Sequence, residues 1–98
     1  MIAKGYWIET GKINSPETRT YLEAIKKWLP TVGGKFLIRD FESIENDGRT
    51  WLLTNVIEFS SKLAAISAYE SPEYQEMISN RENSSEIQLS IVEGVNSL

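Results

Sequence analysis

Four short runs rich in apolar residues, separated by polar segments, predict four β-strands, in which successive side chains point to opposite faces of a sheet. The runs cover residues 2–9, 35–41, 49–59 and 86–95. The third run is apolar on both faces, which is typical of a central strand that is covered on both sides.

The second run has an arginine between apolar neighbours. Strict alternation predicts that Leu37, Arg39 and Phe41 share one face of the strand and that Phe36 and Ile38 lie on the other. Arg39 is then flanked by apolar side chains on its own face of the sheet.

Apolar residues at helical spacing fill the intervals after the first and third runs. A serine N-cap, a proline at the first helical position and a glutamate near the positive end of the helix dipole mark a helix start. This order occurs at residues 15–17 and again at 71–73. A short helix is also predicted after Ser60 or Ser61, and Pro30 ends or kinks the first helix at Leu29.

The resulting order β-α-β-β-α-β predicts an α+β fold, a ferredoxin-like sandwich with an antiparallel four-stranded sheet. We expect a single domain over residues 1–98, with a loose tail at 96–98. Helices would cover one face of the sheet and leave the other bare. A second copy packed sheet to sheet would cover it, so we expect a homodimer in the form of a dimeric α/β barrel.

The composition limits the kinds of site and partner that the protein can have. The chain has no cysteine and no histidine, which excludes disulfides, thiolate metal sites and the commonest general base. The formal net charge of −4 argues against a nucleic-acid partner. No apolar run approaches the roughly 20 residues of a membrane span, so we expect no membrane association and a cytoplasmic location. No metal site, cofactor motif or phosphate-binding loop is visible.

Five short motifs occur in order along nearly the whole chain: KGYWI at 4–8, GGKFLIR at 33–39, VIEF at 56–59, YESPEYQ at 69–75 and IVEGV at 91–95. Together they resemble the domain of unknown function 1330 (DUF1330) family of the dimeric α/β barrel superfamily. The resemblance implies a ferredoxin-like protomer and a homodimer with facing sheets, and no particular activity. The wider superfamily includes cofactor-independent monooxygenases, isomerases and haem enzymes as well as proteins without known catalysis.

Two residues are candidates for holding a small ligand. Arg39 on its strand could bind a carboxylate or a phosphate through two hydrogen bonds. Alternatively, it could pair with Asp40, Glu58 or a partner subunit, or extend its charged end into solvent. Asn55 is the one amide on an otherwise apolar strand face, so it either orients a ligand or buried water, or makes a cross-strand hydrogen bond.

A carboxylate and a set of aromatic residues complete the candidates. Glu58, near the end of the third strand, is a candidate general base, with an ion pair to Arg39 or Lys4 as the alternative. Further aromatic side chains could wall a pocket for a planar molecule, or form plain core or dimer interface. These are Tyr6, Trp51, Tyr69 and Tyr74.

Two functions follow from these candidates. In the first, a small homodimer binds an apolar or aromatic acid between sheet and helices. In the second, the protein is a cofactor-independent enzyme, an isomerase or a monooxygenase, in which Glu58 or a tyrosine transfers a proton and Arg39 anchors the substrate.

Overall fold

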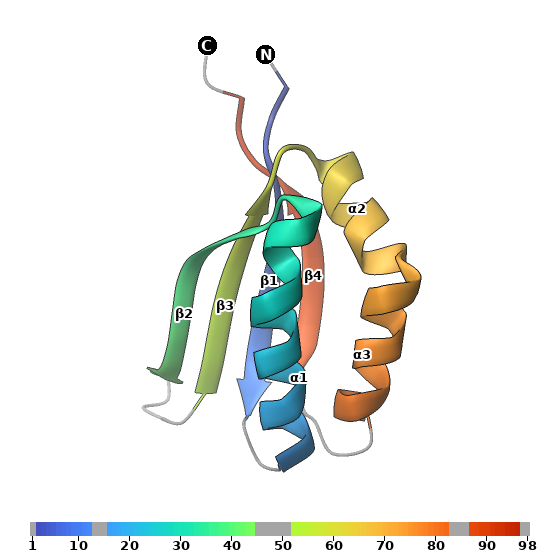
Figure 1. Ribbon diagram of the computed structural model, residues 1–98. Helices are drawn as coiled ribbons and strands as arrows, with labels where there is room; N and C mark the ends of the chain where they lie inside the picture. Colours follow the sequence, from blue (N-terminus) through green and yellow to red (C-terminus); the bar gives the residue numbers. More distant parts are fainter. Residues whose placement is uncertain (1, 13–15, 45–51, 83–86, 97–98) are drawn as a thin grey trace.

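The computed structural model describes residues 2–12, 16–44, 52–82 and 87–96, and it contains four strands, three α-helices and one 3-10 turn (Figure 1). The elements in chain order are β1 (Gly5–Lys12), α1 (Pro16–Trp28), the 3-10 turn η1 (Leu29–Val32), β2 (Lys35–Ser43), β3 (Leu52–Phe59), α2 (Lys62–Glu70), α3 (Pro72–Glu82) and β4 (Gln88–Glu93). Ser15, the predicted cap of α1, lies outside the described residues, as do the last two residues of the predicted tail. No helix in the described part of the chain is long and apolar enough to cross a bilayer.

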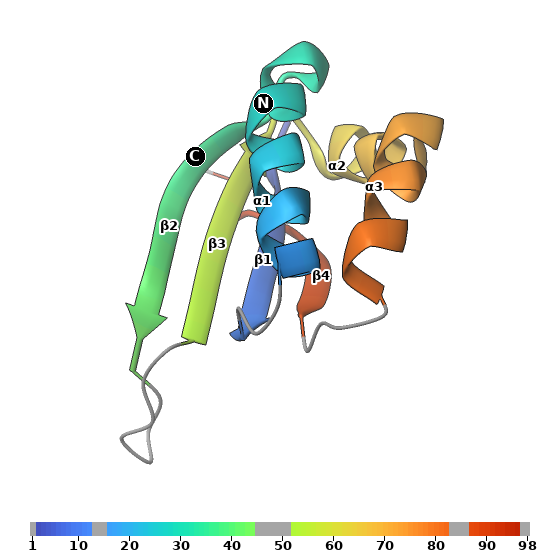
Figure 2. The same ribbon diagram turned by 60° about the horizontal axis from the view of Figure 1, so that its bottom comes forward.

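The four strands form one sheet in the order β2-β3-β1-β4, and every neighbouring pair is antiparallel. The three helices lie on one side of this sheet (Figure 2). The predicted ferredoxin-like fold is therefore confirmed.

A serine joins the second and third helices, as the sequence predicts. The Ser71 hydroxyl donates to the Ala68 carbonyl at the end of α2, at 2.8 Å, and accepts from the Tyr74 amide at the start of α3, at 3.3 Å. Its extended backbone, φ −64° and ψ 146°, separates the two helices. Ser61 caps α2 by accepting from the Ala64 amide at 3.0 Å. The starts of α2 and α3 are thus set by local side-chain hydrogen bonds.

The hydrophobic core lies between the sheet and the helices. It is built from fully or nearly fully buried side chains on all the main elements. The largest are Trp7, Leu53, Ile57 and Phe59 from the sheet, Tyr21, Leu22 and Ile25 from α1, Leu29 from η1, and Tyr74 and Ile78 from α3.

Strand β2 departs from strict alternation. Phe36 pairs with Ile57 while Ile38 pairs with Val56, so Leu37 is an extra residue in β2. Such a β-bulge reverses the faces of the residues that follow it. The prediction that Phe36 and Arg39 lie on opposite faces is therefore wrong: Phe36 packs against the core and Arg39 reaches the Leu22 carbonyl of α1.

Two glycines of the family motifs lie where two segments of the chain approach each other closely. A Cβ atom on Gly5 would lie 2.3 Å from the Ser61 carbonyl oxygen and 2.5 Å from the Lys62 amide nitrogen. On Gly94 it would lie 2.8 Å from the Tyr6 ring, and the Gly94 amide donates to the Lys4 carbonyl at 2.7 Å. Close packing therefore favours glycine at both positions.

Candidate functional site

A row of three polar residues crosses the sheet beneath the helices. Glu9 of β1 pairs directly with Asn55 of β3, and Asn55 pairs directly with Arg39 of β2. Glu9 and Asn55 are fully buried, whereas Arg39 is half-buried near the open edge of the sheet. The row places an acid, an amide and a guanidinium side by side.

The Glu9 carboxylate is the centre of a buried hydrogen-bond network. The Tyr21 hydroxyl of α1 donates to its Oε2, and Asn55 Nδ2 donates to its Oε1 at 3.2 Å. The hydroxyl oxygens of Tyr21 and Tyr74 lie 2.8 Å apart. Since Tyr21 gives its one proton to Glu9, Tyr74 is the donor in that second bond. These contacts offset the cost of burying a carboxylate.

Tyr21 keeps its proton throughout the neutral range. Burial, the charge of Glu9 and the neighbouring Tyr74 raise the pKa of Tyr21 well above 10.0. Tyr21 therefore remains a hydrogen-bond donor to Glu9.

The other amide atom of Asn55 has an unusual environment. Its oxygen Oδ1 is buried and accepts no hydrogen bond from the residues that the structure describes. Because the nitrogen faces Glu9, the oxygen is directed away from Glu9. A buried acceptor without a donor costs about 1–3 kcal/mol, which makes this atom a candidate contact for a ligand or a water molecule.

Arg39 lies over two phenyl rings and has no acidic partner in the part of the chain that the structure describes. Its guanidinium carbon lies 5.0 Å from the centre of the Phe36 ring and 5.3 Å from that of Phe41. Nη2 makes one long bond, 3.5 Å, to the Leu22 carbonyl. Asp40 and Glu58, its predicted alternatives, accept instead from the Glu42 amide and the Tyr6 hydroxyl. Among the described residues no carboxylate forms an ion pair with Arg39.

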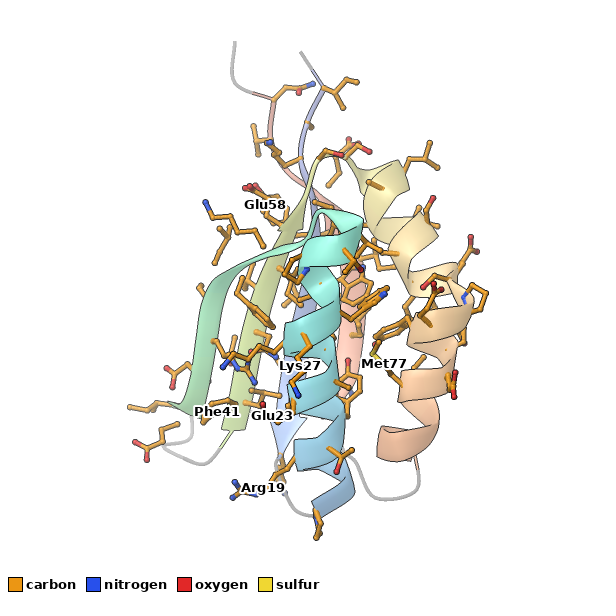
Figure 3. The ribbon with its side chains drawn as sticks, in the orientation of Figure 1. Arg19, Glu23, Lys27, Phe41, Glu58 and Met77 are labelled. Carbon is orange, nitrogen blue, oxygen red and sulfur yellow. The ribbon has the colours of Figure 1, made fainter. Side chains whose placement is uncertain are left out.

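A groove of about 410 Å³ opens beside Arg39, between α1 and β2. Figure 3 shows Glu23 and Phe41 close together in this gap, with Arg19 farther along α1. A second hollow of about 520 Å³ continues over α1 toward Lys27. The lining of the first groove combines two cations, one carboxylate and two apolar side chains: Arg19, Arg39, Glu23, Leu22 and Phe41.

Glu58 and Tyr6 lie on the other face of the sheet. They are direct cross-strand neighbours, and the Tyr6 hydroxyl donates to Glu58 at 3.3 Å. Burial together with the charge and hydrogen bond of Glu58 raises the pKa of Tyr6. The sheet therefore separates the predicted base, Glu58, from Arg39 and Asn55.

The remaining aromatic candidates belong to a cluster under the helices. The Tyr69 and Tyr74 rings lie 5.4 Å apart, and Tyr74 also packs 4.7 Å from Trp7 and 5.7 Å from Trp28. The break at Ser71 thus brings together two tyrosines that a single helix would separate. Trp51 lies outside the described residues.

Comparison with protein families gives one match. A family model described as a domain of unknown function, DUF1330, covers residues 4–95. The chain belongs to the DUF1330 family. No curated protein matches its sequence.

Solved structures share the fold of this DUF1330 chain at low sequence identity. A protein of unknown function from Rhodopseudomonas palustris has a TM-score of 0.71 and 13% identity, covering 99% of this chain and 86% of that one. A candidate antibiotic biosynthesis monooxygenase from Nitrosomonas europaea has a TM-score of 0.61 and 11% identity, covering 97% and 93%. A NIPSNAP family protein of unknown function from Agrobacterium tumefaciens has a TM-score of 0.58 and 15% sequence identity, and the match covers 93% of this chain and 87% of that one.

Two residues of this candidate site are absent from the sequence-based candidates. Glu9 falls two positions after Trp7, on the same strand face, so alternation alone would have placed its carboxylate in the core. Tyr21 lies at an apolar position of the predicted helix, and this pattern predicts only a residue of the hydrophobic core. Only the fold shows that the tyrosine hydroxyl meets the carboxylate.

Proposed function

We propose that this DUF1330 protein binds a small carboxylic acid with an apolar or aromatic body in the groove between α1 and β2. The observation that carries the proposal is the Arg39 guanidinium, which lies over two phenyl rings and has no acidic partner among the described residues. A guanidinium in this setting binds a carboxylate through two parallel hydrogen bonds. The groove volume of about 410 Å³ suits a small ligand.

The rest of the groove suits an apolar body with a single negative charge. Leu22 and Phe41 supply apolar surface beside Arg39. Glu23 on the same wall disfavours a second carboxylate on the ligand, because two like charges at close range repel. The expected ligand is therefore a monoacid.

A thermal-shift screen of aromatic and aliphatic monoacids, followed by calorimetric titration of each hit, tests this function. We expect Arg39→Ala to weaken binding at least tenfold, because hydrogen bonds to a charged group contribute about 1.5–3 kcal/mol. Lys27→Ala is the matched control, since Lys27 lines the second hollow and not the groove beside Arg39, and it should change the affinity much less. Unchanged affinity in Arg39→Ala would exclude the anchoring role.

We also propose that the protein forms a homodimer through the sheet face that the helices leave open. This face presents Tyr6, Ile8, Ile38, Val56 and Val92, which are cross-strand neighbours. Ile38 is 48% exposed. A second copy packed on this face would remove these apolar side chains from water.

Light scattering coupled to size exclusion tests the dimer. Ile38→Lys should produce monomers at micromolar concentration, because it places a charge within the proposed interface. Leu63→Lys is the control, because Leu63 is 71% exposed on α2, on the helical side of the sheet. A monomeric wild-type protein would contradict the proposal.

A cofactor-independent isomerase or monooxygenase is a second candidate function, and the buried Glu9 carboxylate favours it. Glu9 lies in the same row as Arg39, whereas Glu58 lies on the far face of the sheet. In such an enzyme, Glu9 would be the base that removes a proton from a carbon atom of the bound acid. Full turnover by Glu9→Gln of any substrate found would rule Glu9 out as that base.

A further inference from the structure

We infer that the bound acid carries a neutral hydroxyl group next to its carboxylate, as in a 2-hydroxy acid, and that Asn55 Oδ1 accepts the hydrogen bond from this hydroxyl. The inference rests on the proposed function, because Arg39 must hold the carboxylate. It adds a second contact and a narrower ligand class to that function.

The positions of Asn55 and Arg39 support one ligand reaching both. The two residues are directly opposite each other on β3 and β2. Directly paired residues of antiparallel strands have Cα atoms about 4.5–5.5 Å apart. A 2-hydroxy acid carries its hydroxyl and its carboxylate on adjacent carbon atoms, so a single small molecule can span the two side chains.

The orientation of the Asn55 amide is fixed by Glu9. A carboxylate accepts hydrogen bonds and does not donate them, so the amide nitrogen must be the atom that faces Glu9. The amide oxygen is then the atom directed away from Glu9, and β2, which carries Arg39, lies on the side of β3 opposite β1. One acceptor suits one hydroxyl, whereas an ammonium group has three protons to place.

Among the residues that line the groove, Arg39 is the one paired with Asn55 in the sheet. Asn55 is fully buried, while Arg39 is half-buried and lines the groove. The one hydrogen bond of the Arg39 guanidinium within the described residues is the 3.5 Å contact to Leu22. A carboxylate in the groove competes well with so long a bond. Asn55 itself does not line the groove, so a ligand reaches Oδ1 only when the Arg39 side chain moves aside.

Three acids with the same phenyl body test the inference by calorimetric titration of the whole protein: mandelate, phenylacetate and O-methylmandelate. Mandelate carries the hydroxyl, phenylacetate lacks it, and the methyl ether keeps the oxygen but cannot donate. We expect mandelate to bind about tenfold more tightly than the other two, since one new hydrogen bond to a buried acceptor is of that size. In Asn55→Ala, mandelate and phenylacetate should bind equally.

The outcomes separate the inference from the function on which it rests. If all three acids bind wild-type protein equally and Arg39→Ala abolishes that binding, the acid-binding function stands and the hydroxyl contact is refuted, leaving a buried water molecule as the partner of Oδ1. If none of the acids binds, or if binding survives in Arg39→Ala, both proposals fail. Should Asn55→Ala not fold, the comparison of mandelate with its methyl ether on wild-type protein decides alone.

Discussion

Replacing Tyr21 by phenylalanine removes one oxygen atom from the centre of the buried network and leaves the ring in place. This oxygen donates to the Glu9 carboxylate and accepts from Tyr74. A hydrogen bond to a charged group contributes about 1.5–3 kcal/mol and a neutral one about 0.5–1.5 kcal/mol. We therefore expect Tyr21→Phe to lower the free energy of unfolding by about 2–4 kcal/mol, a large share of the total for a small domain.

Two further tyrosines provide matched comparisons. Tyr74→Phe removes the neutral bond to Tyr21, so we expect the free energy of unfolding to fall by at least about 1 kcal/mol. Tyr69 belongs to the same aromatic cluster, but its hydroxyl makes no hydrogen bond within the described residues. Tyr69→Phe should therefore change the free energy of unfolding by less than about 0.5 kcal/mol.

Urea denaturation followed by tryptophan fluorescence measures all three losses, because Trp7 is fully buried in the core that the tyrosines share. Protein concentration must be equal in all samples, since dimerisation would add to the apparent stability. A loss in Tyr21→Phe no larger than the loss in Tyr69→Phe would show that the hydroxyl does not bind Glu9 in the folded protein.

Further predictions concern pH and two glycines. Because the folded-state pKa of Tyr21 is raised above 10.0, its contribution to stability is complete below about pH 10 and is lost as the pH rises further. The stability difference between wild type and Tyr21→Phe should therefore shrink above pH 10 in urea titrations, and a constant difference would contradict the pKa. Gly5→Ala should cost about 3 kcal/mol, because its Cβ meets only backbone atoms of the Ser61–Lys62 segment. Gly33→Ala should lower the free energy of unfolding by about 1 kcal/mol, because Gly33 has a φ of 75° but open space around it. A larger loss in Gly33→Ala than in Gly5→Ala would refute the close approach of Gly5 to the Ser61–Lys62 backbone.

The sequence predicts the fold well because its signals are local. Alternation defines the strands, and serine hydroxyls act within three residues of their own position, as the bonds of Ser71 to Ala68 and Tyr74 show. The order of elements then leaves few topologies, and the ferredoxin-like one is confirmed. No long-range information is needed for these steps.

The site depends on contacts that no local pattern contains. The bulge at Leu37 brings Phe36 and Arg39 to one face, and nothing in the run 35–41 marks the extra residue. The partners of Glu9 are 12 and 46 positions away along the chain. Alternation places Glu9 on the strand face of Trp7, but charged residues are seldom fully buried, so the pattern alone does not show what would satisfy a carboxylate there.

The Glu9 network also determines how the helices are set along the sheet. Apolar contacts are non-directional, and a helix that slid by one turn, about 5.4 Å, would exchange one apolar neighbour for another. The Tyr21 and Tyr74 hydroxyls allow no such exchange, because each must meet its partner within hydrogen-bonding distance. A single buried carboxylate thus selects one axial position for α1 and α3 together, and it specifies which of several well-packed arrangements is the native one.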